Sequence, residues 1–336
     1  MSILSALSDL SADAVDWWFI YKFPEGAVLN GSQKTTGQEY LYFDSSSTPA
    51  LAMSKNRIGS ATGALDRTLN LLSPENRAAQ KSLGWILYND EKPDRSENSG
   101  EEGHSKGVLI FDRETDSALW LLHSWPCFPS LRGDPPPSLE YGQTFLCVTL
   151  RDFQTAEQIA EAVYHQNEPQ VYDFRTDGLA SDSPLYKLAR NSRSNDKRPP
   201  SDMSFQSRAG YEFRFLAKNR HWDEDFWIDW VGPRLGVNLD VESWRRGKLP
   251  GTEDSDETHQ VADALYINLE PLGVDCEWHY TKDHAKWAVS LTDDWVCAAD
   301  INRQTSQEKR GGGTICFQHA QLWRDLSRIV RLKNSP

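Results

Sequence analysis

Short apolar runs, rich in aromatic and β-branched residues, alternate with polar turns along the whole chain. Runs of about four to eight such residues between turn residues are typical of buried β-strands. In the first part of the chain we expect strands at 15–22, 40–43, 84–90, 108–111, 118–122 and 141–148. In the second part we expect strands at 210–218, 237–244, 261–269, 287–289, 295–302 and 314–317. The pattern therefore predicts two groups of strands.

Apolar residues recur at helical spacing in fewer places. These segments are 62–83, where the periodicity is weak, 154–165, 223–235 and a closing helix at 320–332. Between the two groups of strands lies a polar stretch, 176–206, which has many Ser, Asp, Asn and Arg residues and the pair Pro199-Pro200. We interpret this stretch as a linker or a long surface loop.

The two groups of elements follow the same order, which indicates an internal repeat. A strand that ends in lysine, at Lys22 and at Lys218, comes before the later strands of each group. In both groups there follow a strand preceded by a His-x-Lys triplet, a strand with a polar end, a strand opened by glycine, and a helix. We predict an α/β fold with halves at 1–175 and 207–336, each a mixed sheet flanked by helices. A pseudo-two-fold axis between the halves would give them one shared site.

The bulk composition is that of a globular protein, since 38% of the 336 residues are hydrophobic and 25% are charged. We find no run of about 18 apolar residues and therefore expect no membrane span. The N-terminus has no basic region and does not resemble a signal peptide, which leaves the cytoplasm as the default location. The five Cys residues include no paired C-x-x-C, which argues against a structural zinc site and against a disulfide-dense scaffold.

The net charge limits which partners the protein accepts. A formal charge of −13 repels nucleic acid at neutral pH. A polyanion could therefore bind only through a local basic groove, or at acidic pH, where carboxylates are protonated and histidines are charged.

Two His-x-Lys triplets carry the candidate chemistry: His104-Ser105-Lys106 and His284-Ala285-Lys286, each directly before an apolar run. In a strand, residues i and i+2 share a face, so each imidazole points the same way as its ammonium group. The pseudo-two-fold axis would bring both pairs to one site. Each triplet opens a strand, and a second strand follows it along the chain. The second strand ends in polar residues in both groups, at His123 in the first and at Asn302 in the second.

Such a site suits phosphodiester cleavage. One neutral imidazole attacks phosphorus, and the other, protonated, donates its proton to the leaving oxygen. The two lysines hold the non-bridging oxygens, and Asn302 adds a neutral donor. The backbone of residues 311–313, three glycines after Arg310, forms either an anion nest or only a flexible hairpin loop. We expect no divalent metal and no cofactor, since the lysines supply the positive charge.

These motifs carry a family resemblance. The paired His-x-Lys triplets with a downstream Asn resemble the phospholipase D superfamily, and nearly the whole chain resembles the deoxyribonuclease II family. The matching segments are 15–24, 103–107, 120–126, 141–144, 283–287 and 310–314. The resemblance implies two phospholipase D-like halves. It also implies a metal-independent acid endonuclease that leaves 3′-phosphate and 5′-hydroxyl ends through a phosphohistidine intermediate.

The resemblance also implies residue roles. His104 is the expected nucleophile and His284 the general acid, while Lys106, Lys286 and Asn302 clamp the phosphate. His123 occupies a position where the family has a functionally sensitive histidine. The superfamily aspartate at a fixed distance after the lysine is absent in register after Lys286. Cys297 with Cys316 remains as a candidate disulfide, and the eukaryotic relatives imply a secretory or lysosomal location.

Several interpretations stay open. The two triplets could be strand starts with solvated charges, Asn302 could serve a turn, and His123 could be a core histidine. DNA is the expected partner, no membrane is expected, and a homodimer is neither required nor excluded. A phospholipase D-type phosphodiesterase acting on lipid or another diester is the alternative enzyme. A non-catalytic polyanion-binding protein is the alternative outside enzymes.

Overall fold

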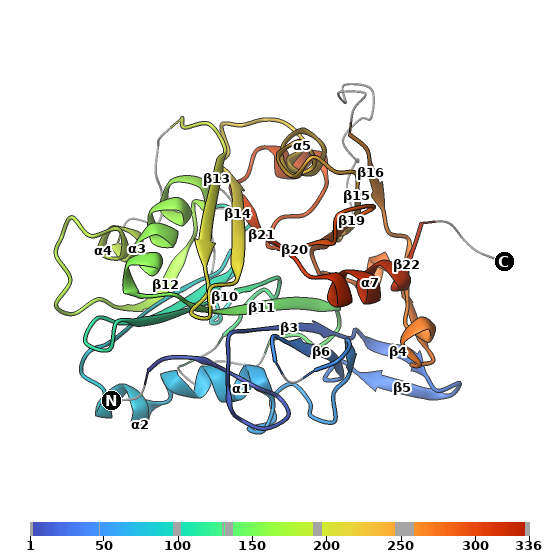
Figure 1. Ribbon diagram of the computed structural model, residues 1–336, viewed down its shortest axis with the longest axis horizontal. Helices are drawn as coiled ribbons and strands as arrows, with labels where there is room; N and C mark the ends of the chain where they lie inside the picture. Colours follow the sequence, from blue (N-terminus) through green and yellow to red (C-terminus); the bar gives the residue numbers. More distant parts are fainter. Residues whose placement is uncertain are drawn as a thin grey trace.

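The computed structural model describes residues 3–46, 48–96, 102–129, 131, 137–190, 197–245 and 259–332. Two large sheets organise the molecule (Figure 1). The first has the strand order β12 (Val171–Arg175), β8 (Leu83–Tyr88), β9 (Gly107–Asp112), β10 (Ser117–His123), β11 (Gln143–Leu150), β3 (Trp17–Lys22), β6 (Tyr40–Asp44) and β7 (Ala52–Met53). The second has the order β13 (Ser201–Gln206), β14 (Glu212–Lys218), β21 (Gly312–Gln318), β20 (Trp295–Ala299), β19 (Trp287–Ser290), β15 (Leu239–Glu242) and β16 (Val261–Asp263).

Two smaller sheets complete the strands of the described residues. One has the order β22 (Val330–Arg331), β17 (Tyr266–Asn268), β18 (Cys276–His279), β4 (Glu25–Leu29) and β5 (Gln33–Thr36). The other pairs β1 (Ala6–Leu7) with β2 (Ala14–Val15). Since β4 hydrogen-bonds to β18, the five-stranded sheet joins the beginning of the chain to its last third.

Helices and turns lie outside and between the two large sheets (Figure 1). They are α1 (Ala64–Leu69), η1 (Asn70–Leu72), α2 (Pro74–Ala79), α3 (Phe153–Ala162), η2 (Val163–Asn167), α4 (Pro184–Arg190), η3 (Phe226–Val231), α5 (Gly232–Leu235), η4 (Glu270–Leu272), η5 (Tyr280–Lys282), α6 (Thr305–Glu308) and α7 (Ala320–Ile329). None of the helices in the described ranges is long and apolar enough to cross a membrane.

The main hydrophobic core fills the layer between the two large sheets, together with the buried faces of α3, α4 and α7. Aromatic side chains connect the sheets directly: the Trp120 ring meets Phe215 edge-on at 4.9 Å, and Trp17 meets Phe317 at 4.9 Å. A second core lies between the first sheet and α1, and a third between the second sheet and η3. The large sheets are therefore covered on both faces, which explains why their strands are continuously apolar rather than alternating.

A run of four neighbouring strands has the same order in both large sheets. β9, β10, β11 and β3 are neighbours in the first sheet, and β19, β20, β21 and β14 are neighbours in the second. These strands correspond to the elements of the predicted repeat. The coarse prediction of an α/β fold is confirmed.

The polar stretch 176–206 differs from the predicted linker. It contains α4, whose Leu185 and Leu188 are buried against the main core, and it contains β13, which pairs with β14. The Glu157 carboxylate of α3 accepts hydrogen bonds from the Leu185 N–H at 2.9 Å and from the Ser183 hydroxyl at 2.8 Å. The prediction of one long surface loop is therefore wrong, because a few buried contacts order a largely polar segment.

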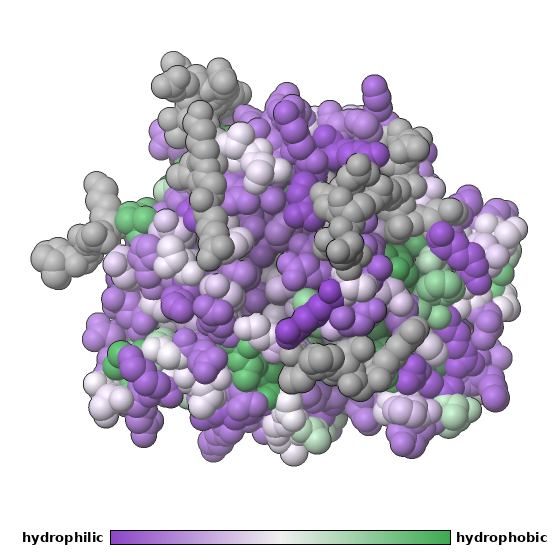
Figure 2. All heavy atoms as spheres, turned by 180° about the vertical axis from the view of Figure 1, so that it is seen from behind, coloured by the Kyte–Doolittle hydropathy of each residue, from purple (hydrophilic) through white to green (hydrophobic). Residues whose placement is uncertain are grey.

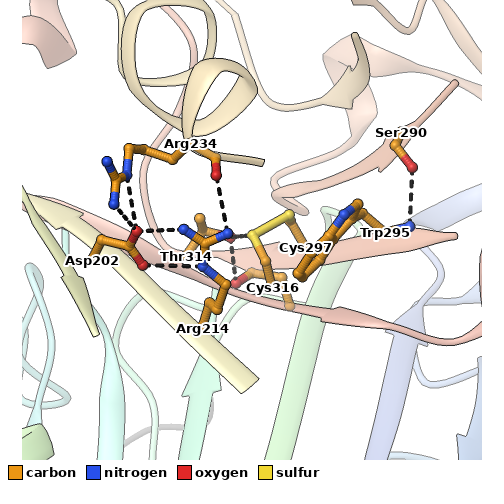
Figure 3. The surroundings of a disulfide bond; sticks show 9 residues. Asp202, Arg214, Arg234, Ser290, Trp295, Cys297, Thr314 and Cys316 are labelled. Atoms are coloured by element: carbon orange, nitrogen blue, oxygen red, sulfur yellow. Dashed lines mark hydrogen bonds and ion pairs between the residues drawn. A yellow bond between two sulfur atoms is a disulfide. The ribbon is translucent and has the colours of Figure 1, made fainter. Parts of the chain in front are cut away.

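The predicted disulfide is present. Cys297 of β20 and Cys316 of β21 face each other across the sheet and are bonded (Figure 3). Beside this bond, Asp202 accepts hydrogen bonds from Arg214 and Arg234. The other three cysteines are free and buried.

Hydrophilic residues dominate the face of the molecule seen in Figure 2, and hydrophobic residues form small separate patches there. Large hydrophobic side chains that are exposed among the described residues are Ile3, Leu10, Val28, Phe174, Leu291 and Leu332. Single exposed apolar residues of this kind are normal for a protein surface.

Candidate active site

The two His-x-Lys triplets lead directly into corresponding strands of the two large sheets. Lys106 precedes β9 and Lys286 precedes β19, and their exposures are only 1% and 2%. The backbone N–H of His104 donates to the carbonyl of Gly311 at 2.7 Å, and that of His284 donates to Gly142 at 3.0 Å. Each histidine is therefore anchored by a glycine that precedes a strand of the other large sheet.

The two triplets meet at one buried centre. The charges of Lys106, Lys286 and His284 each act on the His104 imidazole. Burial lowers the pKa of His104 well below its ordinary value, and these neighbouring positive charges lower it further. Burial and Lys106 also lower the pKa of Lys286 to about 7. All four predicted side chains of the triplets therefore share one electrostatic environment.

His104 has charged neighbours. Nη1 of Arg310 lies 3.1 Å from Nδ1 of His104. Arg310 is fixed by further hydrogen bonds to the carbonyls of Glu102 and Gly103. On the other side of the ring, Oδ2 of Asp90 lies 3.4 Å from Nε2 of His104.

His284 has aromatic neighbours instead. The Tyr141 ring is stacked on the His284 ring with centroids 3.8 Å apart and planes inclined by 10°. The Trp244 ring lies 4.3 Å from the same imidazole. Nζ of Lys286 donates to the His284 carbonyl at 2.7 Å. A surface cavity of ≈ 600 Å³ opens beside His284 and Tyr141 and gives access to this side of the centre.

Asp300 fixes the backbone of both sides of the centre. Its carboxylate accepts from the Gly313 N–H at 2.8 Å and from the Lys106 N–H at 3.4 Å. The amide of Asn167 donates to it at 3.3 Å. Burial raises the pKa of Asp300 to about 7, although the hydrogen bond from Gly313 and the charge of Lys106 oppose the rise.

His123 lies at the end of β10, buried among the aromatic rings of Phe128 and Phe145. Its Nδ1 accepts from the Trp125 N–H at 3.2 Å. Burial, Lys106 and Lys286 lower its pKa well below the ordinary value. The ring is therefore close enough to both lysines to feel their charge, yet packed as a core histidine is, and both interpretations of His123 remain open.

Asn302 is buried, and its side-chain oxygen has no hydrogen-bond partner among the described residues, so its role as a phosphate donor stays a prediction. The glycines 311–313 serve close packing. A Cβ on Gly311 would lie 2.5 Å from the Gln166 carbonyl oxygen. The prediction of an anion nest is wrong for Gly313, because its N–H already donates to Asp300.

Comparison with known proteins agrees with this arrangement. The sequence profile of the family described as deoxyribonuclease II matches residues 9–335. The chain belongs to the deoxyribonuclease II family. The resemblance drawn from the sequence motifs is thus confirmed, and the protein is a nuclease of this family.

Named relatives of this deoxyribonuclease II family member come from bacteria and animals. The chain is 47% identical over 320 residues to a putative deoxyribonuclease-2 of Burkholderia pseudomallei (strain K96243), covering 94% of this chain and 89% of the relative. It is 33% identical over 340 residues to deoxyribonuclease-2-alpha of Rattus norvegicus, covering 98% and 93%. It is 32% identical over 361 residues to deoxyribonuclease-2 of Caenorhabditis elegans, covering 97% and 92%.

The site of this family member also contains residues that the sequence patterns did not single out as site residues: Asp90, Tyr141, Trp244 and Asp300. Asp90 and Trp244 each follow the end of a strand by two residues, β8 in one sheet and β15 in the other. Both strands were predicted, but their correspondence was not recognised. If 84–90 and 237–244 are treated as equivalent elements of the repeat, both residues are predicted to lie at the site.

No group of three or more His, Cys, Asp and Glu side chains suited to hold a metal lies together within the described ranges. The polar groups that face each other in the centre are imidazoles, ammonium groups, one guanidinium and the carboxylates of Asp90 and Asp300. This set of residues favours the binding of an anion.

Proposed function

We propose that the protein is an acid endodeoxyribonuclease that hydrolyses DNA to 3′-phosphate and 5′-hydroxyl ends, without a metal, through a phosphohistidine intermediate. The observation that carries the proposal is the meeting of both His-x-Lys triplets at one buried centre. Family membership supports DNA as the substrate, since the relatives are named deoxyribonucleases.

In the first step, a ring nitrogen of neutral His104 attacks phosphorus. The N–P bond forms, the bond between phosphorus and the 5′ oxygen breaks, and protonated His284 gives its proton to that oxygen. The lowered pKa of His104, caused by burial and by its positive neighbours, supports this assignment because it keeps the attacking ring neutral.

In the second step, water attacks phosphorus and the N–P bond breaks. His284, now neutral, accepts a proton from the water, so the 3′-phosphate leaves and both histidines return to their first states. Lys106 and Lys286 hold the non-bridging oxygens in both steps and stabilise the charge that spreads over the phosphoryl group.

The pairing of the two sheets supports two phospholipase D-like halves related by a pseudo-two-fold axis. The strand orders of the two large sheets correspond. The hydrogen bond from His104 to Gly311 has a counterpart in the one from His284 to Gly142. Two-fold symmetry would produce such a reciprocal exchange of contacts between equivalent elements.

Activity at acidic pH follows from the charge of the centre and of the surface. A lysine is charged below its pKa, so Lys286, with a pKa of about 7, is fully charged only in acid. The formal net charge of −13 also becomes less negative as carboxylates are protonated, which reduces the repulsion of DNA. Metal independence is proposed because the lysines and Arg310 supply the positive charge that a divalent ion provides in other nucleases.

The test is digestion of supercoiled plasmid across a pH series, with and without EDTA. We expect nicking that is strongest in acid and unchanged by the chelator, with 3′-phosphate ends. His104→Ala and His284→Ala should each abolish nicking without changing the thermal unfolding of the protein. A His284→Ala enzyme with a 5′-bridging phosphorothiolate substrate, whose leaving group needs no proton, should accumulate the phosphohistidine. The reaction is stopped with an alkaline denaturant, because the N–P bond breaks in acid.

Specific results would reject the proposal. Retained activity in both histidine variants, or a strict dependence on Mg²⁺, would contradict the mechanism. Release of lipid head groups without plasmid nicking would assign the protein to the alternative diesterase. Plasmid binding without any turnover would assign it to the non-catalytic alternative. Asn302→Ala and His123→Ala, measured in the same assay, decide whether these residues take part.

A further inference from the structure

A carboxylate occupies the place in the centre where the mechanism needs an anion. Oδ1 of Asp90 lies 2.7 Å from Nζ of Lys106, and Oδ2 lies 3.4 Å from Nε2 of His104. The same Oδ2 lies 4.0 Å from Nη2 of Arg310, and the charge of Asp90 also acts on Lys286. We call the space between Lys106 Nζ, His104 Nε2 and Arg310 Nη2 the anion site.

The sheet places Asp90 there. Tyr88, the last residue of β8, pairs with Gly107, which directly follows Lys106. The chain then continues past the end of the sheet, and the Asn89 side-chain amide holds the turn by donating to the carbonyls of Trp125 and Phe128 at 3.0 and 2.7 Å. Asp90 is only 5% exposed, so its carboxylate is a built part of the centre rather than a mobile surface group.

The corresponding position beside the other triplet carries no charge. Glu242, the last residue of β15, pairs with Trp287, which directly follows Lys286. Two residues beyond Glu242 the chain has Trp244, whose ring packs on His284. The two sheets therefore bring one carboxylate to the centre at these equivalent positions, and it lies beside the expected nucleophile.

We propose that the Asp90 carboxylate occupies the anion site when no substrate is bound. There it excludes small anions, and the phosphodiester of DNA displaces it. One carboxylate and one phosphate cannot both lie within hydrogen-bonding distance of Lys106 Nζ and His104 Nε2 in the same place. A phosphate that binds must therefore displace Asp90 from Lys106. The carboxylate also offsets the repulsion between Lys106, Lys286 and Arg310 when no substrate is bound.

This competition discriminates by the number of contacts that a ligand offers. A free phosphate must replace the Asp90 contacts with its own and gains little, whereas a DNA strand brings further phosphates and bases that bind outside the anion site. Asp90 is therefore a specificity-determining residue, which favours DNA over inorganic phosphate at the anion site. The identity of the displaced ligand as DNA rests on the proposed function, but the exclusion of small anions does not.

The test is calorimetric titration of the full-length protein with inorganic phosphate at one fixed pH and ionic strength. We compare the wild type, Asp90→Asn and Glu91→Gln. Glu91 is the matched control, since it is the next residue, its variant changes the charge equally, and it lines the outer cavity instead of the anion site. We expect Asp90→Asn to bind phosphate about tenfold more tightly or better, because one charge-assisted contact need no longer be broken.

Glu91→Gln should change the phosphate affinity by less than about threefold, the change expected from distant charge alone. Unchanged affinity in Asp90→Asn would overturn the proposal, as would no measurable binding by either protein. An equal gain in both variants would also overturn it, because the effect would then be general electrostatics. The titration needs no turnover. If the protein failed to nick plasmid, the proposed function would be rejected, but the measured effect of Asp90 on phosphate affinity would still hold.

A second measurement starts from the wild type, so its first comparison does not depend on how the variant folds. In a crystal structure of the wild type soaked with inorganic phosphate at high concentration, a bound phosphate should contact Lys106 and His104 while Asp90 has turned away. A phosphate bound on these two residues with Asp90 still in contact with Lys106 would contradict the proposal. So would a centre that stays free of phosphate in Asp90→Asn crystals under the same soak.

Discussion

At the scale of single residues, the two imidazoles of the centre have different neighbours although they occupy corresponding places. Arg310 and Asp90 flank His104, whereas Tyr141 and Trp244 flank His284. Arg310 acts on the proton equilibrium of His104, and the Asp90 carboxylate lies beside that ring. The aromatic pair instead fixes the ring of His284 by packing. This difference supports unequal roles for two histidines that the sequence motif alone presents as equivalent.

Arg310 helps to lower the pKa of His104, and the variant Arg310→Gln tests this effect. Besides burial, the nearby guanidinium helps to lower the pKa of His104, so its loss should raise that pKa. The ring would then become protonated at higher pH, and the acid limb of kcat/KM should move upward by roughly one pH unit. The pH profile of plasmid nicking measures this shift. Arg324→Gln, a change on the exposed side of α7, should leave the profile in place.

Lys286 should set the opposite limb. Its pKa, lowered to about 7 by burial and by Lys106, means that it loses its charge as the pH rises through that value. Phosphate binding should weaken accordingly, so kcat/KM should fall above about pH 7. Lys286→Gln should remove the contribution of Lys286 to this limb, leaving only that of the general acid His284. It should also reduce kcat/KM by about a hundredfold, the usual cost of one transition-state donor.

Lys282→Gln is the matched control for Lys286→Gln. Lys282 lies four residues earlier in the same segment and is exposed, with a long contact of 3.5 Å to Glu140. Its replacement should change neither the limb nor the rate by more than about twofold, since exposed ion pairs contribute little. Equal losses in the two variants would show that a general change of surface charge, rather than Lys286 itself, controls the alkaline side.

At the scale of elements, the continuously apolar strands were predictable from the sequence, and their partners were not. A strand covered on both faces has a continuous apolar run, so 15–22, 108–111 and 118–122 stood out in the sequence. Asp90 and Trp244 reached the centre through sheet pairing between distant strands, which one sequence does not reveal. The triplets were found because their spacing is local.

The missed helix α4 had a signal of its own. Ser183 followed by Pro184 is a common start of a helix, because proline suits the first helical position and needs no N–H partner there. The polar composition of 176–206 outweighs that signal in the sequence. The buried Glu157 carboxylate then supplies an acceptor for the first turn, at Leu185, which only the folded structure brings close.

The disulfide between β20 and β21 stabilises the second sheet (Figure 3). It closes a loop over a sequence separation of 19, for which the loss of chain entropy in the unfolded state corresponds to about 3 kcal/mol. The double variant Cys297→Ala/Cys316→Ala should lose roughly that much free energy of unfolding in a urea titration. Reductant should lower the stability of the wild type to the level of the variant and leave the variant unchanged. Equal stability of both oxidised proteins would contradict this role.

At the scale of the whole molecule, three positive side chains gather at one centre of a protein whose net charge is strongly negative. The formal net charge is −13, yet Lys106, Lys286 and Arg310 all act on the same imidazole. Long-range attraction therefore contributes little to DNA binding, and local contacts at the centre must supply the affinity. The two triplets belong to different sheets, so the geometry of the centre depends on how the two sheets are joined.

The contact between the two sheets at Gly311 can be tested by substitution. Its carbonyl fixes the His104 backbone, and a Cβ there would lie 2.5 Å from the Gln166 carbonyl oxygen and 2.7 Å from that of Asn167. Gly311→Ala should push the start of β21 away from η2 and displace His104. A displacement of about 1 Å costs on the order of a hundredfold in rate, so nicking should fall by that factor while the protein stays folded.

Gly178→Ala separates this effect from a simple loss of stability. Gly178 has a φ of +77°, and a methyl group added there would have no neighbouring atom within 4 Å, so the variant is strained but makes no clash. It should lose about 1 kcal/mol of stability and keep its nuclease rate. Circular dichroism melts and plasmid nicking, measured on both variants, give the comparison. If Gly311→Ala cleaved DNA as fast as Gly178→Ala, the contact between the two sheets at Gly311 would not be what positions His104.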